Sequence, residues 1–148
     1  MKNNNNQIIK IKNNTDVIRI KTKDNSKKGK LSVFEENKDI SFEFKRIYYI
    51  YDVPKDVRRG FHAHKELKQL LFCPYGEIEI ILDNGIKRKQ VLLNNPDKGL
   101  IIEEGIWREM VWKKEGSVLC VAASNYYDEN DYIRDYDLFL QMMQKGYW

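Results

Sequence analysis

Hydrophobic and polar positions alternate with a period of two through the middle of the chain, as they do in β-strands that bury one face. Ser41–Tyr51 alternates and is rich in aromatic residues, and Glu77–Leu82 alternates again. The tripeptide at 83–85, Asp-Asn-Gly, follows directly, and an Asn-Gly pair favours a tight hairpin because both central positions of that turn need positive φ. We therefore expect residues 87–93 to return as the partner strand.

Before this hairpin, Gln69–Phe72 is an apolar run. After it, glycine and proline divide the chain into further short strands, expected at Leu100–Ile102, Ile106–Trp112 and Ser117–Ala123. Their spacing fits an antiparallel sandwich or barrel. Only the tail changes period, with apolar residues at helical spacing over about 131–144 and with Asp128 and Asn130 as candidate caps. We predict a single all-β domain over residues 1–148, a barrel with one C-terminal α-helix on its outside.

Length and composition agree with this prediction. The 148 residues allow one ordinary domain, and 42% hydrophobic with 32% charged residues is typical of a folded globular protein. No apolar run is long enough to cross a bilayer, and residues 1–6 contain no apolar export segment, so we expect a cytoplasmic protein with no membrane partner. The same Asn-rich residues 1–6 leave two structures open, a frayed end and an added strand. Cys73 and Cys120 lie in apolar runs, where we expect small buried thiols rather than a disulfide.

The net charge of +4 comes in part from lysines within residues 21–30. No basic face with interleaved aromatic platforms accompanies them, and no known recognition motif, so nucleic-acid binding is disfavoured. A modest positive surplus instead favours a small polyanionic ligand.

The two histidines of the chain, His62 and His64, stand two positions apart in the segment RGFHAHK. Residues with that spacing on a strand face the same side, so both imidazoles are expected in one cavity. Imidazoles titrate near neutral pH and can remove a proton from a carbon next to a carbonyl, while cationic or hydrogen-bonding donors hold the enolate oxygen.

The spacing of His62, His64, Gln69 and Gly76 resembles the first sequence motif of the cupin superfamily, and the segment EEGIWR that ends at Arg108 is similar to the second. The resemblance implies a cupin barrel. It also places Gln69 where cupins carry a metal-binding glutamate and Arg108 where they carry a metal-binding histidine. An amide is a poor ligand for transition metals and a permanent cation repels them, so we expect neither a metal nor another cofactor.

Longer segments resemble one family more closely, the 3,4-ketoisomerases that act on dTDP-4-keto-6-deoxyglucose. These segments are KRIYYIYDVP (45–54), RGFHAHKELKQLLF (59–72), DKGLII (97–102), GIWREM (105–110) and ASNYYDENDYIRDYDLF (123–139). The resemblance implies an isomerase that moves the keto group from C4 to C3 by proton transfer through an enediol. It implies a dTDP-linked keto sugar as ligand and a place in deoxysugar biosynthesis for surface polysaccharides such as O-antigen.

The resemblance further implies roles for individual residues. Proton transfer falls to His62 and His64, with His64 as our choice of base, and Tyr48 donates to the sugar oxygen or relays a proton. Arg46 matches a position at the pyrophosphate, and the other residues expected to bind the substrate are Arg59, Gln69, Arg108, Lys28 and Tyr132. Two alternatives stay open: Gln69 satisfies buried hydrogen bonds only, and Tyr132 only anchors the helix. The stereochemical outcome at C4, gluco or galacto, is implied to depend on groups near Lys28 and Arg108.

Other functions stay open from sequence. A 3,5-epimerase of the same nucleotide sugar also uses histidine and tyrosine in a metal-free barrel, and a non-catalytic sugar or nucleotide sensor would bind without chemistry. A metal-dependent cupin oxygenase is disfavoured by Gln69 and Arg108. The family resemblance also implies a homodimer in which an N-terminal strand crosses to the partner, with the aromatic strand Phe42–Tyr51 at the interface.

Overall fold

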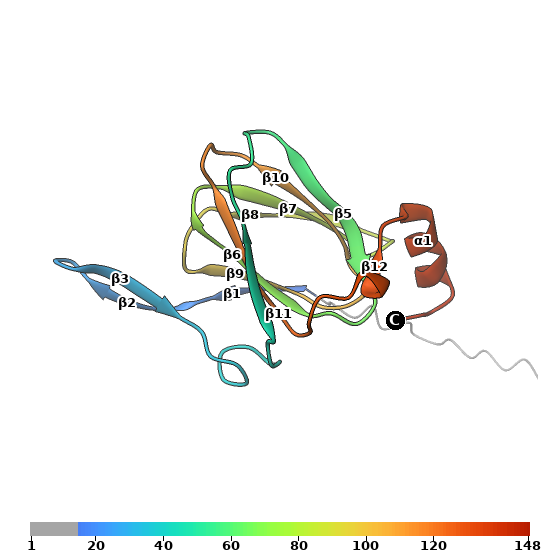
Figure 1. The fold of residues 1–148 in the computed structure, drawn as a ribbon, viewed down its shortest axis with the longest axis horizontal. Helices are drawn as coiled ribbons and strands as arrows, with labels where there is room; N and C mark the ends of the chain where they lie inside the picture. Colours follow the sequence, from blue (N-terminus) through green and yellow to red (C-terminus); the bar gives the residue numbers. More distant parts are fainter. Residues whose placement is uncertain (1–14) are drawn as a thin grey trace, which may run out of the picture.

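The computed structural model describes residues 15–148, which form two antiparallel five-stranded sheets, a separate hairpin and one α-helix (Figure 1). The strands are β1 (Thr15–Arg19), β2 (Lys21–Asn25), β3 (Gly29–Val33), β4 (Arg46–Ile50), β5 (Arg58–His64), β6 (Gln69–Tyr75), β7 (Ile78–Asp83), β8 (Arg88–Leu93), β9 (Lys98–Ile102), β10 (Trp107–Trp112), β11 (Val118–Ala123) and β12 (Tyr132–Ile133). A 3₁₀ turn, η1 (Glu129–Asp131), precedes β12, and the helix α1 (Tyr136–Gln144) follows it.

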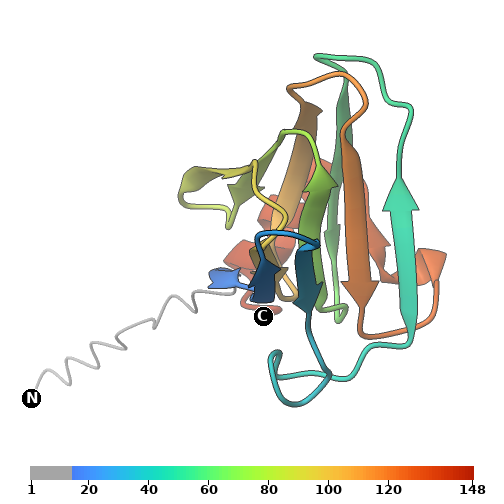
Figure 2. The ribbon, with the colours of Figure 1, turned by 90° about the vertical axis from the view of Figure 1, so that its left-hand side faces the viewer.

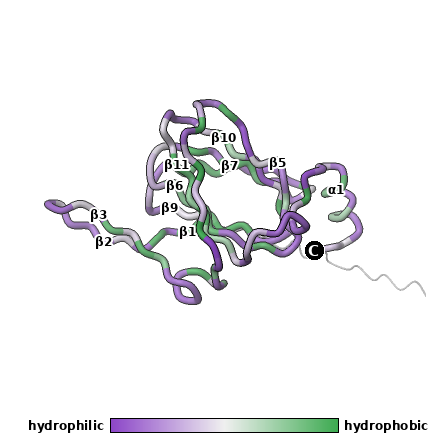
Figure 3. The backbone as a smooth tube through the Cα atoms, in the orientation of Figure 1, coloured by the Kyte–Doolittle hydropathy of each residue, from purple (hydrophilic) through white to green (hydrophobic). Residues whose placement is uncertain are grey.

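The two sheets face each other and enclose the core as a barrel (Figures 1 and 2). One sheet has the strand order β1-β9-β6-β11-β4 and the other the order β12-β5-β10-β7-β8. The largest core cluster draws buried side chains from both sheets, among them Leu71, Ile80, Leu100 and Val121. Figure 3 shows hydrophobic segments along β6, β7, β10 and β11, which lie around this core. The predicted all-β barrel of the cupin type, with one C-terminal helix, is confirmed.

The hairpin predicted at residues 83–85 joins β7 to β8. Asn84 N–H donates to the carbonyl of Lys87 at 3.2 Å, and Gly85 has a φ of +83°. Asp83 pairs with Arg88 as the first rung of the ladder. The turn therefore sets the register of two strands that form one edge of the second sheet.

Two predicted elements are shorter than expected. The strand predicted over 41–51 is β4, residues 46–50 only. Its partner β11 ends at Ala123, opposite Arg46, so residues 41–45 lack a neighbouring strand, and Phe42 packs instead in a second apolar cluster that contains Leu70 and Ala122.

The helix predicted from about 131 begins at Tyr136. Tyr132 and Ile133 pair with His64 and Ala63 as β12, which keeps this part of the chain extended. The helix is capped by Asp135, whose carboxylate accepts from the Leu138 N–H, and not by Asp128 or Asn130. Asp128 caps η1.

The β2–β3 hairpin projects away from the barrel, on the side opposite β5 and β12 (Figure 1). None of the helical segments in residues 15–148 has the length and hydropathy that a membrane crossing requires. The two structures left open for residues 1–6 lie outside the described residues.

Candidate active site

Strand β5 carries both histidines and contains a β-bulge immediately before them. Gly60 pairs with Glu109 and His62 with Arg108, so Phe61 is an extra residue on this strand. Gly60 has a φ of +93° and Phe61 a φ of +54°. A Cβ on Gly60 would lie 2.9 Å from the carbonyl oxygen of Arg108, so the bulge requires glycine here.

The bulge changes which residues of β5 share a face. Cross-strand partners project to the same side, and Arg59 pairs with Met110 while His62 pairs with Arg108. Met110 and Arg108 are two apart on β10 and therefore share one face. Arg59 and His62 thus lie on the same side although three positions separate them, which regular alternation forbids.

A cavity of about 310 Å³ opens at this face. Its lining includes Arg46, Tyr48, Arg59, His62, Tyr127, Tyr132 and Arg134. Five of the nine predicted site residues therefore border one space, and three more, His64, Gln69 and Arg108, are buried beside it. Lys28 is not brought to this cavity, because it lies in the turn of the β2–β3 hairpin (Figure 1).

The two imidazoles contact each other and differ in exposure. Their ring centroids are 4.8 Å apart at an interplanar angle of 87°, and the Tyr132 ring lies 5.0 Å from His62 and 4.4 Å from His64. His62 is 8% exposed and lines the cavity, whereas His64 is 0% exposed. A ligand in the cavity therefore meets His62 first.

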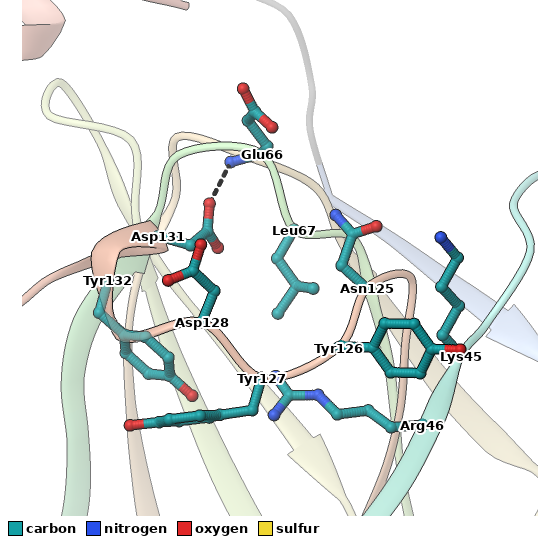
Figure 4. A pocket seen from close by; sticks show the side chains of 10 residues that line it. All are labelled: Lys45, Arg46, Glu66, Leu67, Asn125, Tyr126, Tyr127, Asp128, Asp131 and Tyr132. Carbon is teal, nitrogen blue, oxygen red and sulfur yellow. Dashed lines mark hydrogen bonds between the residues drawn. The ribbon is translucent and has the colours of Figure 1, made fainter.

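His64 is held by the carboxylate of Asp131. Its Nδ1 lies 2.9 Å from Asp131 Oδ2, while Oδ1 accepts the Glu66 N–H at 2.9 Å, the contact drawn in Figure 4. Because a carboxylate only accepts, Nδ1 carries the proton and Nε2 keeps its lone pair. Nε2 of His64 is buried without a hydrogen-bond partner among residues 15–148.

Both histidines are neutral over the physiological range. Burial, with the nearby Arg108 cation as the next cause, lowers the pKa of His62 to about 3. Burial lowers the pKa of His64 to about 4, against the opposing hydrogen bond from Asp131. Two unprotonated imidazoles are thus available as proton acceptors.

Gln69 and Arg108 form a fixed pair beneath the cavity. The Arg108 guanidinium is 0% exposed, donates from Nε and Nη2 to the Ile106 carbonyl at 3.2 and 2.8 Å, and donates from Nη1 to Gln69 Oε1. Gln69 Nε2 in turn donates to the Tyr48 hydroxyl at 2.9 Å. Within residues 15–148 no three His, Cys, Asp or Glu side chains gather in a way that could hold a metal ion. At the cupin ligand positions stand an amide whose oxygen already accepts from a guanidinium and the guanidinium itself, and such groups do not fit a divalent metal.

Arg46 stands between the rings of two tyrosines. Its guanidinium carbon is 5.3 Å from the Tyr48 centroid and 5.5 Å from that of Tyr127, and its Nε is buried without a partner among the described residues. Arg46, Tyr127 and Tyr132 also line a second hollow of about 270 Å³, which Lys45 borders as well (Figure 4). Arg46 has no ion pair with an acidic side chain among residues 15–148 and borders both spaces, as an anion-binding group should.

Sequence reasoning missed Asp131 and Tyr127. Asp131 was hidden in an acidic stretch, DENDY, where any carboxylate suits a solvated turn. Tyr127 is 61% exposed, and its hydroxyl hydrogen-bonds to Glu129. The available signal was that this stretch contains Tyr132, which was already a candidate.

Comparison with known proteins gives consistent results. The family model FdtA, described as WxcM-like, C-terminal, matches residues 12–144. The TDP-4-oxo-6-deoxy-alpha-D-glucose-3,4-oxoisomerase of Aneurinibacillus thermoaerophilus is 45% identical over 118 residues, which cover 80% of this chain and 85% of the relative.

Solved structures agree with this match. The sugar 3,4-ketoisomerase QdtA of Thermoanaerobacterium thermosaccharolyticum, in complex with TDP, superposes with a TM-score of 0.88 at 43% identity, covering 93% of this chain and 100% of its own. A 3,4-ketoisomerase of Helicobacter canadensis gives 0.84 at 46% identity, covering 88% and 97%. A 4-keto-6-deoxy sugar epimerase of Streptomyces spheroides reaches 0.70 at only 13% identity, over 81% and 68% of the two chains, and so shares the fold alone.

Proposed function

Because the chain belongs to the FdtA family of WxcM-like C-terminal domains, we propose that it is a sugar-nucleotide 3,4-ketoisomerase acting on dTDP-4-keto-6-deoxyglucose. The enzyme moves the keto group from C4 to C3 of the hexose. The relatives named above carry this activity or bind TDP. The epimerase alternative has weaker support, because its representative shares only the fold.

One observation carries the chemical part of the proposal: the neutral imidazole of His62 lines a cavity that also holds three tyrosines and three arginines, and the neutral imidazole of His64 is in ring contact behind it. A C3 proton is acidic because it lies next to the C4 ketone, so the reaction needs a base and a donor for the C4 oxygen. The cavity supplies both.

The proton moves are balanced as follows. A histidine takes the C3 proton and its electron pair forms the C3–C4 double bond, while the C4 oxygen gains a proton to give the enediol. The O3 proton is then lost to solvent, which also supplied the proton on the C4 oxygen, and the C3 ketone forms. The imidazolium exchanges its proton with solvent while the enediol is bound and then protonates C4. We assign the first step to His62, since it lines the cavity and His64 does not. This favours His62 over His64, our choice from sequence, and makes His64 the partner that Asp131 orients behind it.

Substrate binding is assigned to the groups that border the cavity. Arg46 and Arg59 are proposed to hold the pyrophosphate, because guanidinium groups bind phosphate oxygens in a bidentate manner. Tyr132 covers both histidines and would face the sugar. Gln69 and Arg108 act from behind the cavity wall, since both are fully buried.

The test is turnover in deuterated water. With dTDP-4-keto-6-deoxyglucose, NMR should show the 3-keto product with deuterium at C4, and His62→Asn should abolish this exchange while the variant still binds dTDP. A 4-keto product with deuterium at C3 and C5 would instead identify an epimerase. A protein that binds the nucleotide but exchanges no proton would be a sensor, and the proposal would fail.

We also propose a homodimer with exchange of the N-terminal hairpin. The β2–β3 hairpin projects away from its own barrel (Figure 1), and the edge strand β4 exposes Ile47 and Tyr49. An unpaired apolar edge is a natural site for a further strand. Lys28, at the hairpin tip, would then reach the partner's cavity and contact substrate there.

Light scattering tests the dimer, and mixing two inactive variants tests the exchange. A mixture of the Lys28→Ala protein and the His62→Asn protein should recover activity, because a dimer with one chain of each contains one site in which both residues are wild type. No recovery from a verified mixed dimer would place Lys28 outside the partner's site.

A cytoplasmic location is also proposed, supported by the free thiols of Cys73 and Cys120.

A further inference from the structure

The buried contacts of Tyr48, Gln69 and Arg108 cross the barrel from one sheet to the other. Tyr48 lies on β4 and Gln69 on β6, both in the first sheet, while Arg108 lies on β10 in the second. The three side chains form a linear chain of hydrogen bonds, Arg108 to Gln69 and Gln69 to Tyr48. Only Tyr48 borders the cavity.

The hydrogen bond from Arg108 to Gln69 determines the donor and the acceptor of the bond between Gln69 and Tyr48. A guanidinium has only N–H donors, so the side of the Gln69 amide that faces Arg108 must be its oxygen. Arg108 itself is fixed, because Nε and Nη2 both bond to the Ile106 carbonyl. The amide nitrogen of Gln69 therefore faces Tyr48, and the phenol oxygen accepts from it.

The consequence falls on the single proton of the Tyr48 hydroxyl. It cannot point to Gln69, because the amide nitrogen offers hydrogens and no lone pair. In the part of the chain from 15 to 148 it has no acceptor, and Tyr48 is the member of the three that lines the cavity, so the free direction for this proton is toward the cavity. Burial raises the pKa of Tyr48, so the phenol keeps this proton at neutral pH.

We propose that Gln69 and Arg108 are positioning residues that turn the Tyr48 hydroxyl proton into the cavity, so that Tyr48 is a permanent donor to the substrate oxygen. This rests on the proposed ketoisomerase function, in which the C4 oxygen becomes an enolate oxygen. A donor that is already aimed at the developing charge needs no reorganisation during the reaction. The two positions that bind metal in other cupins thus serve here to orient a hydrogen bond.

The decisive variant is Gln69→Glu, which keeps the size of the side chain and reverses the second bond. A carboxylate accepts from Arg108 and also from the Tyr48 hydroxyl, so the proton turns away from the cavity. We expect kcat to fall by about 10²-fold, as it does when one oxyanion donor is removed, and to match Tyr48→Phe. Gln69→Met removes the constraint without reversing it, so its kcat should fall less than that of Gln69→Glu.

Stability provides the readout that separates orientation from a merely structural role. Gln69→Glu gains an ion pair with Arg108, whereas Gln69→Met leaves a buried cation with one partner fewer. The melting temperature should therefore be lower for Gln69→Met, while kcat should be lower for Gln69→Glu. If kcat followed melting temperature across both variants, Gln69 would only support the fold.

A double variant controls for the added negative charge. Kinetics are measured in EDTA, because the carboxylate that Gln69→Glu introduces beside His62 and His64 would rebuild a metal-ligand set. If Gln69→Glu acts through Tyr48, adding it to the Tyr48→Phe variant should lower kcat little further. An undiminished cost in that background would assign the effect to charge and overturn the proposal.

Neutron diffraction of deuterated crystals tests the same idea without turnover. The Tyr48 deuteron should point into the cavity in the wild type and toward residue 69 in Gln69→Glu. A wild-type deuteron directed at Gln69 would refute the orientation even if the enzyme is an active ketoisomerase. Conversely, a wild type without ketoisomerase activity would remove the proposed function, and the deuteron position would still decide the orientation.

Discussion

Acid should destabilise this protein well above the pH at which its carboxylates titrate, and the two buried histidines are the cause. Their pKa values in the fold are about 3 and about 4, against 6.5 for the unperturbed group. Between pH 4 and pH 6.5 both histidines are protonated in the unfolded chain and unprotonated in the folded chain. A histidine with a lowered pKa therefore costs stability as the pH falls from about 6.5 toward 4, and none above it.

The magnitude follows from the unfolded state, since the folded histidines remain almost unprotonated at pH 5. Protonating one free imidazole stabilises the unfolded chain by about 2 kcal/mol on going from pH 7 to pH 5. Two histidines together give about 4 kcal/mol, a large part of the ~5–15 kcal/mol that stabilises a typical domain. The pKa values of Asp83 and Asp131 are lowered from 3.8, so these groups add their own loss mainly below pH 4.

Urea unfolding at pH 7, 6 and 5, followed by fluorescence, measures this loss directly. The matched control is the double variant His62→Asn/His64→Asn, in which the slope of stability against pH should nearly vanish over the same interval. A parallel decline in wild type and control would refute the reasoning. So would histidine pKa values above 6 in an NMR titration of the folded protein.

Three further results are expected. Asp131→Asn should lower kcat by about 10-fold to 100-fold with little change in KM, because the amide no longer fixes the His64 tautomer; unchanged kcat would separate Asp131 from the reaction. Arg46→Lys should raise KM for the nucleotide sugar by about 10-fold, since a point charge replaces a bidentate contact, and titration of dTDP by calorimetry should show the same loss. Gly60→Ala should lower the free energy of unfolding by about 1–3 kcal/mol through its positive φ and its contact with the Arg108 carbonyl, and equal stability by urea denaturation would contradict the bulge.

Periodicity predicted the fold well because most strands bury one face and turn at recognisable residues. The β7–β8 hairpin follows from its Asn-Gly turn, and α1 from its apolar spacing. Element ends were less predictable, since they depend on partners. β4 begins where β11 can pair with it, and the start of α1 is delayed because Tyr132 and Ile133 are taken up by β5.

Sequence predicted the site residues that lie together in one motif. It missed those that only a tertiary contact brings to the site. His62, His64 and Gln69 follow from a motif, whereas Asp131 reaches His64 across 67 positions and only the neighbouring Tyr132 marks its stretch of the sequence. The lowered pKa values also depend on burial beside Arg108, which no sequence pattern expresses.

The bulge at Phe61 shifts the inside–outside alternation of strand β5 by one residue. Side chains before it and after it are assigned to inside and outside by opposite parity, so the strand can offer Arg59 and His62 to one ligand. Losing a single residue at 60–61 would not shorten a loop: it would exchange the two sides for every position on one half of the strand. Insertions and deletions here should consequently be far less tolerated than substitutions of the exposed Phe61 ring, and sequence alignments that place a gap at this point would misassign the site.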